Sequence, residues 1–556
     1  MRRRLAVPAL VLLLAAPLLL GPGAPLAQEG AEEVPAQEGP PQAAEPGDEA
    51  AAETAVPAAE GDAVVLSLEE VLTSALENNL DITVRSYEPL KSAALLLGSE
   101  SVFDPSVTGM GSTRTLQDPR PSSFLRSLDT ETYTLAFEDP LTFGASYRLD
   151  FIASDSRSVT LFSPAGLDEI NTTWRLTYTQ PLLRNLGRQA NRWRILVSRN
   201  NVSASESVYR QEVLDTLAAA EKAYWNLNFA LMDLKTKRGS LQLAKDFLEQ
   251  NRIKVRVGTL APIEITQAEA GVADREEAVI LAENAVNTAE DAVRRIINVP
   301  KDSPVWSRPI RPSAVPPLNE VTPDMAAAVE EAAIHRPDLE QARLLVRNRE
   351  YEMVYRRNQR RWALDLQGIY GNDGFDPASY SDAFEDLRER NQEDWTVSLT
   401  LGVPIGNRLA KAFYRETEAF LMQARLDLDR LDQLARVEVR NTVRLVETNL
   451  KRVRAAQVNV RLQREKLAAE QKKFENGMST SFQVLQFQTD LSSAESRENA
   501  AIVDYNNSLV ELERVKGTLL ASRNLALPGM PEGPGAGEGE GALMREILHD
   551  GFPGAA

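Results

Sequence analysis

Apolar residues recur at alternating spacings of three and four along two stretches of the chain, each about seventy residues long. The first stretch runs from about 187 to 257, and the second from about 407 to 476. A period near 3.5 that is sustained this long predicts helices that pack as coiled coils. With a rise of 1.5 Å per residue, each helix would measure roughly 105 Å, which is far longer than a compact globular domain requires.

Each long helix is followed by a glycine, Gly258 in the first case and Gly477 in the second. Glycine is favoured just past the end of a helix because it accepts the left-handed backbone conformation there. Helical periodicity then resumes in two return helices, over about 262–298 and 479–521. The pattern therefore predicts two antiparallel helical hairpins with these glycines at their turns.

Three other segments, 172–182, 362–370 and 396–403, alternate apolar and polar residues. Strict alternation predicts β-strands with one apolar and one polar face. Such strands suit either a half-buried sheet or a barrel with lipid outside and water inside, especially because aromatic residues lie near the strand ends. Two of the segments close with a proline, Pro181 near the end of the first and Pro404 directly after the third, before a helical pattern begins.

The same succession of elements occurs twice, in residues 63–298 and again in residues 324–525. Between these two repeats, residues 299–323 form a linker with seven prolines. Each repeat opens with a predicted helix, at about 67–101 and 324–360. An opening helix stacked end to end on a return helix would equal a long helix in length, so each chain would present four helix columns.

The two ends of the chain are predicted not to belong to this fold. Residues 1–27 combine a basic start, an apolar run and small residues, which is typical of a secretory signal peptide; the alternative is an uncleaved anchor helix. Residues 28–62 hold ten acidic residues, five prolines and no lysine or arginine, and residues 526–556 are rich in Gly, Pro and Glu. Both segments are predicted to be disordered, because they cannot bury enough apolar surface to offset their chain entropy.

The composition excludes several classes of function. The chain has no cysteine, so disulfides, thiol catalysis and a lipid-modified N-terminal cysteine are excluded. A formal net charge of −18 argues against nucleic acid as a partner. The histidines are His335 and His549, and no phosphate-binding glycine loop, HExxH motif or nucleophile elbow occurs. We therefore predict a protein that is not an enzyme and has no catalytic, cofactor or metal site.

Strands with a lipid-type alternation cannot stand alone, since an open sheet edge is not tolerated in lipid. Four to six strands are also too few to close a barrel, which needs about eight. Copies of the chain must therefore close the barrel together, and the same copies would place their helix columns in a ring. A barrel continuous with a helical tube would let solutes cross the outer membrane and the periplasm.

The order of these elements resembles the TolC family of outer-membrane efflux proteins, over nearly all of 63–521. Short phrases similar to those of the family occur in register in both halves. They are Thr-Gln-Pro-Leu-Leu at 179–183, Ala-Tyr-Trp-Asn-Leu at 223–227, Val-Gly-Thr at 257–259, Arg-Pro-Asp-Leu at 336–339, Val-Pro-Ile at 403–405 and Asn-Gly at 476–477. Their common order, rather than any one phrase, carries the resemblance.

The resemblance implies a mainly α-helical fold with a membrane β-barrel portion, in which a coiled-coil helical tunnel continues an antiparallel barrel shared by three chains. It implies a homotrimer in the lipid of the outer membrane, with its helices in the periplasm. The expected partners are a periplasmic adaptor of the membrane-fusion type and an inner-membrane pump or ABC exporter. The chain would then be the passive duct of a multi-component efflux or secretion system.

The first half carries an additional predicted hairpin, with strands at about 132–137 and 143–151, whereas the family usually has two strands per half. Its short turn would face the periplasm, and flanking loops at about 114–130 and 154–171 would face the outside. We hypothesise that this hairpin joins the barrel wall. The wall would then have six strands per chain and eighteen per trimer, rather than twelve.

The glycine turns lie at the helix ends farthest from the strands, where the family has an entrance that closes like an iris. By their positions relative to the turn glycines, the resemblance places four residues near this mouth: Glu264, Gln483, Gln486 and Phe474. The turn residues expected to dock the adaptor are Gly258, Thr259, Gly477 and Met478. The alternative is that all of them are solvated helix-tip residues without a role in gating.

A soluble periplasmic coiled-coil adaptor or scaffold is the alternative function. It would explain the heptad pattern, but not the twofold repeat or the aromatic-rich strands. The arginine-rich run at 356–361, just before a predicted strand, also has two interpretations. It is either a solvated surface or a contact with anionic headgroups or lipopolysaccharide.

Overall fold

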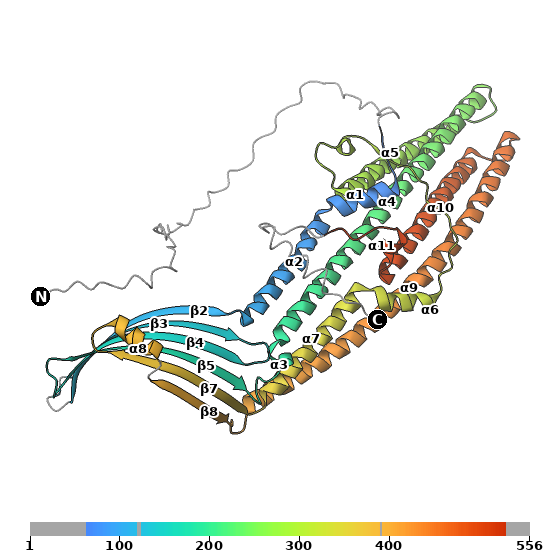
Figure 1. The fold of residues 1–556 in the computed structure, drawn as a ribbon. Coiled ribbons are helices and arrows are strands. Elements are labelled where there is room, and N and C mark those ends of the chain that lie inside the picture. The colour runs from blue at the N-terminus through green and yellow to red at the C-terminus, as the bar shows by residue number, and fades with distance from the viewer. Residues whose placement is uncertain (1–62, 119, 121–123, 390–391, 530–556) are drawn as a thin grey trace, which may run out of the picture. The chain divides into compact units, whose positions relative to one another are not determined.

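The computed structural model describes residues 63–118, 120, 124–389 and 392–529. The predicted signal peptide, the acidic linker at 28–62 and residues 530–556 of the predicted tail lie outside these residues. Helices make up most of the described part, and the strands form a large antiparallel sheet and a small parallel one (Figure 1). None of the helices in these residues has the combination of length and apolar character needed to cross a membrane.

Each repeat contributes a series of helices. Those of the first repeat are α1 (Leu68–Asn78), α2 (Leu80–Glu100), the short α3 (Arg188–Asn191), α4 (Trp193–Arg256) and α5 (Ile263–Ile297). Those of the second are α6 (Met325–His335), α7 (Pro337–Gln359), α8 (Tyr380–Glu389), α9 (Arg408–Glu475), α10 (Ser481–Lys516) and α11 (Leu519–Ser522).

The two long helices match their predictions. Helix α4 has 64 residues and α9 has 68, which corresponds to roughly 96 and 102 Å. The apolar stripe of α4 is buried, since Val213, Leu217 and Tyr224 are each at most 1% exposed. Helix α4 packs along α2 and α5, and α9 packs along α7 and α10. This arrangement is the predicted stacking of an opening helix on a return helix (Figure 1).

The prediction of continuous opening helices was wrong, because each is broken into two. The first breaks at Asn79 (φ −67°, ψ 127°) and the second at Arg336 (φ −68°, ψ 122°). At the first break the Asn79 side chain accepts hydrogen bonds from the next helix and caps it. At the second, Pro337 disfavours a helical conformation of the residue before it.

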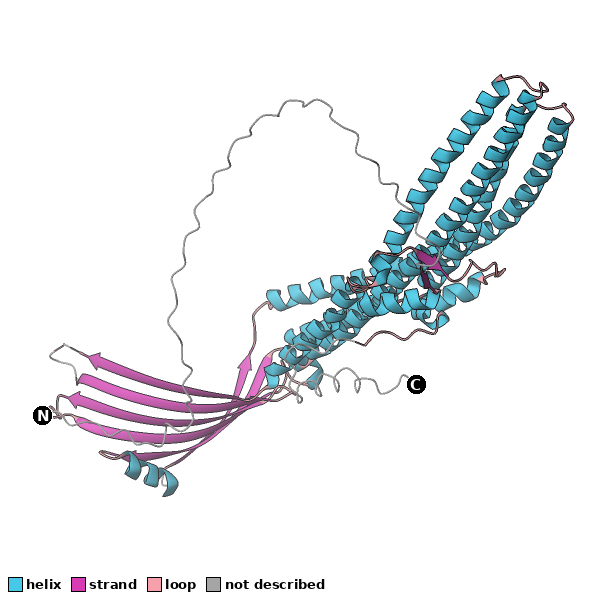
Figure 2. Cartoon of the chain, turned by 90° about the horizontal axis from the view of Figure 1, so that it is seen from above, coloured by secondary structure: helices cyan, strands magenta, loops and turns pink. Residues whose placement is uncertain are grey.

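The large sheet is antiparallel, and its strand order in the described residues is β2-β3-β4-β5-β7-β8. Its strands are β2 (Ser106–Gln117), β3 (Leu125–Pro140), β4 (Ser146–Thr160), β5 (Leu167–Pro181), β7 (Ala363–Asp376) and β8 (Glu393–Gly402). Figure 2 shows these strands together at one end of the helices, with the hairpin turns at the other end.

The additional hairpin, β3 and β4, lies within this sheet, as we predicted. The prediction of loops at 114–130 and 154–171 was wrong, because the strands continue through most of both segments. In these outer parts both faces of the strands carry polar side chains. The backbone ladder therefore continues without the alternation of apolar and polar residues that marked the inner parts.

The proline-rich linker is held against the helices by two buried tyrosines, one from each repeat. Tyr224 of α4 donates to the Leu66 carbonyl and accepts from the Ala314 amide. Tyr505 of α10 donates to the Asn319 carbonyl and accepts from the Val321 amide. Beside Tyr224, β1 (Val64–Leu66) pairs in parallel with β6 (Ile310–Pro312). The linker is therefore fixed at the middle of the helical part.

Candidate functional site

One face of the large sheet is apolar from edge to edge. Directly paired residues share a face, so each row of cross-strand partners has one character. One such row consists of Val107, Phe137, Leu149, Leu176, Tyr370 and Trp395. The neighbouring row on the other face consists of Thr108, Ala136, Asp150, Arg175, Gly371 and Asp394.

The apolar face is open in the single chain. Trp395 is 72% exposed, Val397 65% and Leu399 62%. The outer strands β2 and β8 each pair on one side only within the described residues. An apolar patch of this extent, with two free edges, would aggregate in water and requires an apolar environment.

Helix α8 covers the end of this apolar face that is farthest from the long helices (Figure 1), and we did not predict this helix. Thr172 donates to the Ala383 carbonyl at 2.9 Å. A Cβ on Gly374 would lie only 2.1 Å from the same carbonyl oxygen, so glycine permits the close approach. Ala383 and Leu387 are buried against the strands. The uncovered apolar band therefore ends at α8.

Both hairpin turns use the same capping motif. The amide of Gly258 donates to the Val255 carbonyl, and the next amide donates to Lys254. The amide of Gly477 donates to the Phe474 carbonyl, and the next amide donates to Lys473. These two bonds define a Schellman motif, which requires the positive φ of 80° and 74° that the two glycines adopt. Thr259 and Met478 follow the glycines, and Met478 is 70% exposed.

Phe474 lies in the apolar core between the two hairpins. It is 5% exposed, and its ring centroid is 5.1 Å from that of Phe247 on α4. The Lys254 ammonium lies 4.1 Å from the same centroid. Phe474 therefore joins the tips of α4 and α9 within one chain.

The other three predicted mouth residues differ in their surroundings. Glu264 is half-buried, and its Oε2 has no hydrogen-bond partner in the described part of the chain. Gln483 and Gln486 are exposed, and Gln486 donates to Asp490 at 3.0 Å. The placement of Glu264, Gln483 and Gln486 at a constriction remains a prediction, because the constriction would be formed by several chains.

Arg275 of α5 is a site residue that the sequence analysis missed. Its guanidinium is buried and donates to Ser240 of α4, to the Leu485 carbonyl and to Thr489 of α10. No carboxylate pairs with it in the described residues, and burial lowers its pKa. It occupies an otherwise apolar stripe with Ala268, Val272, Val279 and Ala282. The signal that could have identified Arg275 in the sequence is its position on this apolar stripe, where an arginine must find polar partners.

A second polar contact lies closer to the tips. Asn251 of α4, fully buried, donates to the Ser481 hydroxyl at 2.9 Å. Glu470 of α9 accepts from Ser479 in the turn and pairs with Lys473, and these contacts lower its pKa, the hydrogen bond from Ser479 most strongly. Polar groups therefore fix both the turn and the contact between hairpins.

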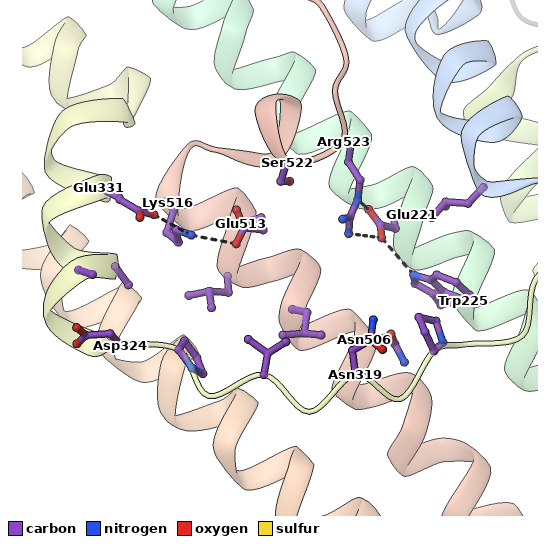
Figure 3. A pocket seen from close by; sticks show the side chains of 18 residues that line it. Glu221, Trp225, Asn319, Asp324, Glu331, Asn506, Glu513, Lys516, Ser522 and Arg523 are labelled. Carbon is purple, nitrogen blue, oxygen red and sulfur yellow. Dashed lines mark hydrogen bonds and ion pairs between the residues drawn. The ribbon is translucent and has the colours of Figure 1, made fainter.

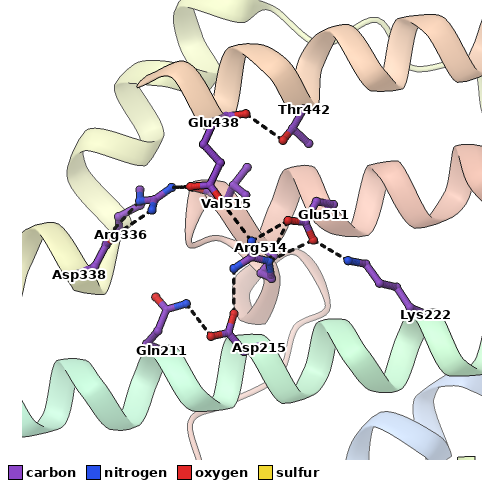
Figure 4. A network of polar contacts seen from close by, with 10 residues as sticks. All are labelled: Gln211, Asp215, Lys222, Arg336, Asp338, Glu438, Thr442, Glu511, Arg514 and Val515. Atoms are coloured by element: carbon purple, nitrogen blue, oxygen red, sulfur yellow. Dashed lines mark hydrogen bonds and ion pairs between the residues drawn. The ribbon is translucent and has the colours of Figure 1, made fainter. Parts of the chain in front are cut away.

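The contact between α4 and α10 is polar at its other end too. Arg514 of α10 pairs with Asp215 of α4 at 2.9 Å and with Glu511 at 2.6 Å. Lys222 of α4 also reaches Glu511, and Arg514 extends to Glu438 of α9 (Figure 4). The two repeats are thus joined by a network of charges, which adds to the apolar packing within each hairpin.

A cavity of about 510 Å³ lies between the linker, α4, α6 and α10 (Figure 3). Glu221 in its wall is 2% exposed. Its carboxylate accepts two hydrogen bonds from Arg523 and one from Trp225. These bonds satisfy the buried carboxylate and hold the segment after α11 in place. Across the described residues, no cluster of three or more acidic or histidine side chains could hold a metal ion.

Comparisons with known proteins agree with this architecture. The family described as outer membrane efflux protein matches residues 148–299 and 328–518. The CmeC outer membrane channel of Campylobacter jejuni is 15% identical with a TM-score of 0.58, over 81% of this chain and 86% of CmeC. The outer-membrane channel OprN is 16% identical with a TM-score of 0.61, over 81% of this chain and 90% of OprN. VceC of Vibrio cholerae is 13% identical with a TM-score of 0.58, over 83% of this chain and 97% of VceC. No curated protein gives a significant sequence match.

Proposed function

Because this chain belongs to the outer membrane efflux protein family, we propose that it is the outer-membrane duct of a multi-component efflux or secretion system. Family membership makes it a transport channel and not an enzyme. In our proposal it conducts cargo passively from a periplasmic pump assembly to the exterior. Its sheet lies in the outer membrane and its helices lie in the periplasm.

The observation that carries the proposal is the sheet with one continuous apolar face and two free edges. In lipid these edges must pair, and the partners available to β2 and β8 are the corresponding strands of other copies. Three copies would close a wall of eighteen antiparallel strands. The same copies would bring twelve helix columns into a ring, which continues the barrel as a tunnel.

The hairpin tips are the proposed entrance and the docking place for an adaptor. Exposed residues at both turns, including Val257 and Met478, support a contact with another protein at this end. An inner-membrane pump or ABC exporter would complete the assembly. The signal peptide at 1–27 and the two repeats at 63–298 and 324–525 belong to the same proposal.

The first test is the oligomeric state. Native mass spectrometry of detergent-extracted protein should show a trimer as the main species, because only several copies can close the sheet. Extraction should also require detergent. A main species of one or two chains would contradict the shared barrel, and release without detergent would favour the soluble adaptor or scaffold.

The second test concerns Glu264. If its half-buried carboxylate lines the mouth, three copies supply the fixed charge of the constriction, since Gln483 and Gln486 are neutral. Glu264→Gln should then bring the cation-to-anion permeability ratio close to one in planar-bilayer recordings. Glu269→Gln, at an exposed carboxylate paired with Arg252 on the same hairpin, is the matched control and should leave selectivity unchanged. Unaltered selectivity in the Glu264 variant would place that residue outside the constriction.

A further inference from the structure

Basic residues accumulate without acidic ones where three helices meet the sheet. Residues 182–199 contain five arginines, residues 353–364 contain four, and residues 403–415 contain two arginines and one lysine. None of these three segments contains Asp or Glu. The whole chain, by contrast, has 62 basic and 80 acidic residues. We call these three segments the basic collar.

The three segments lie together in the fold. The backbone N–H of Asn185 donates to the side-chain oxygen of Asn358 at 2.7 Å, which joins the first segment to the second. The Asn407 side chain donates to the Arg360 carbonyl at 3.0 Å, which joins the second to the third. In Figure 1 they lie where β5, β7 and β8 connect to α3, α7 and α9. The collar is therefore a single region at the junction of sheet and helices.

Most of the collar charges have no acidic partner. Within the described residues, Arg199 pairs with Glu100 and Arg356 with Glu352, while the other ten basic side chains form no ion pair. Three arginines lie over aromatic rings: Arg360 over Tyr414, Arg194 over Trp193 and, besides its pair with Glu352, Arg356 over Phe413. A guanidinium held on an aromatic face keeps its N–H groups available to an anion.

The collar begins on the apolar face of the sheet. Beyond the last ladder pair, the Leu182 amide donates to the Leu364 carbonyl and the Arg184 amide to the Trp362 carbonyl. These two bonds continue the register of the ladder beyond β5 and β7, so Arg184 lies opposite Trp362, next to the pair of Leu182 and Leu364. Trp362 is 54% exposed. The apolar face thus ends in a tryptophan beside an arginine, the combination favoured at a membrane–water interface.

We propose that the basic collar binds the anionic phospholipid headgroups of the leaflet next to the periplasm and so fixes the depth of the sheet in the membrane. This inference rests on the proposed function, because it takes the apolar face as the membrane face. Arginine suits the ligand, since its planar fork donates two parallel hydrogen bonds to a phosphate. The charge is complementary to such a leaflet, and it is concentrated within a few residues of the apolar band.

The test compares lipids retained by the trimer after reconstitution in bilayers of phosphatidylethanolamine with one-quarter phosphatidylglycerol. The collar variant replaces Arg184, Arg188, Arg357 and Arg408 with Gln. The control variant replaces Arg256, Arg440, Arg444 and Arg461 with Gln, which removes the same charge outside the collar. Native mass spectrometry then counts the two lipids that remain bound.

Wild type and control should retain phosphatidylglycerol enriched several-fold over its share of the bilayer, and the collar variant should retain it at its share. The wild-type enrichment should also fall in high salt, because exposed charges are screened. Equal enrichment in wild type and collar variant would overturn the proposal. So would a preference for added lipopolysaccharide over phosphatidylglycerol, or a change in ion selectivity without a change in bound lipid, which would place the charges in the lumen.

Conductance in pure phosphatidylethanolamine separates this inference from the proposed function. All three proteins should form pores there, because the apolar face alone inserts. A wild type that forms no pore would refute the proposed function and the collar with it. A wild type that forms pores but shows no enrichment of phosphatidylglycerol would refute the collar alone.

Discussion

Val397→Arg is expected to abolish assembly of the protein in the outer membrane. Val397 lies on the apolar face of β8, opposite Gly368 of β7, and is 65% exposed in the single chain. An arginine at the lipid midplane of a barrel costs about 2–4 kcal/mol, so three copies would cost roughly 6–12 kcal/mol per trimer. That is comparable to the whole stability of an ordinary domain. The fraction that migrates as an intact trimer on unheated gels measures the loss.

The neighbouring residue supplies the control. Ser398 is adjacent in sequence but lies on the other face, opposite Gln367. An arginine at Ser398 would point to the polar side of the sheet, and the trimer fraction should stay close to that of wild type. Equal losses in the two variants would show that the two faces are not lipid and water.

The long helices and their turns could be predicted because their signals are local and repeated. A stripe such as Val213, Leu217 and Tyr224 persists over many turns, and a glycine follows each helix. Strands were predictable only where one face is apolar. Strand β2 has Gly109, Gly111 and mainly polar neighbours, so its alternation is invisible although its ladder is complete.

Some elements depend on contacts that no local pattern encodes. Helix α8 forms within a polar stretch, and it packs on the sheet where Gly374 permits a close approach. The break at Asn79 arises because one side chain caps the following helix, and its amide group also donates to the Ile296 carbonyl of α5. Such contacts join residues that are far apart in the sequence.

The candidate site shows the same division. Gly258 and Gly477 were predicted from their places after long helices, and both adopt the expected positive φ. Arg275 was missed because a polar residue on an apolar stripe reads as an interruption. Its partners on α10 lie 210 and 214 residues away, so nothing near it in the sequence indicates them.

Arg275 also gives the sharpest test of the tips as a gate. Its side chain is one of the ties between the α4–α5 hairpin and α10, through the Leu485 carbonyl and Thr489, both at 3.1 Å. Helix α10 comes very close here, since a Cβ on Gly271 would lie 3.2 Å from the Leu485 side chain. Arg275→Met keeps the length of the side chain and removes both bonds. Because no carboxylate pairs with Arg275 in the described residues, methionine leaves no buried charge unpaired, and the variant should fold and form trimers.

Resting conductance is the quantity that Arg275→Met should change. Hydrogen bonds from a charged donor contribute about 1.5–3 kcal/mol each, and a loss of only about 1.4 kcal/mol from the closed tip increases the open population tenfold. Planar-bilayer recordings of the variant should therefore show a resting conductance raised on the order of tenfold. Arg238→Met is the matched control, because Arg238 pairs with Glu283 within the α4–α5 hairpin and makes no tie to α10 among the described residues. If both variants have the wild-type resting conductance and melting temperature, opening does not break the contact between Arg275 and α10. The gate would then lie elsewhere along the tunnel.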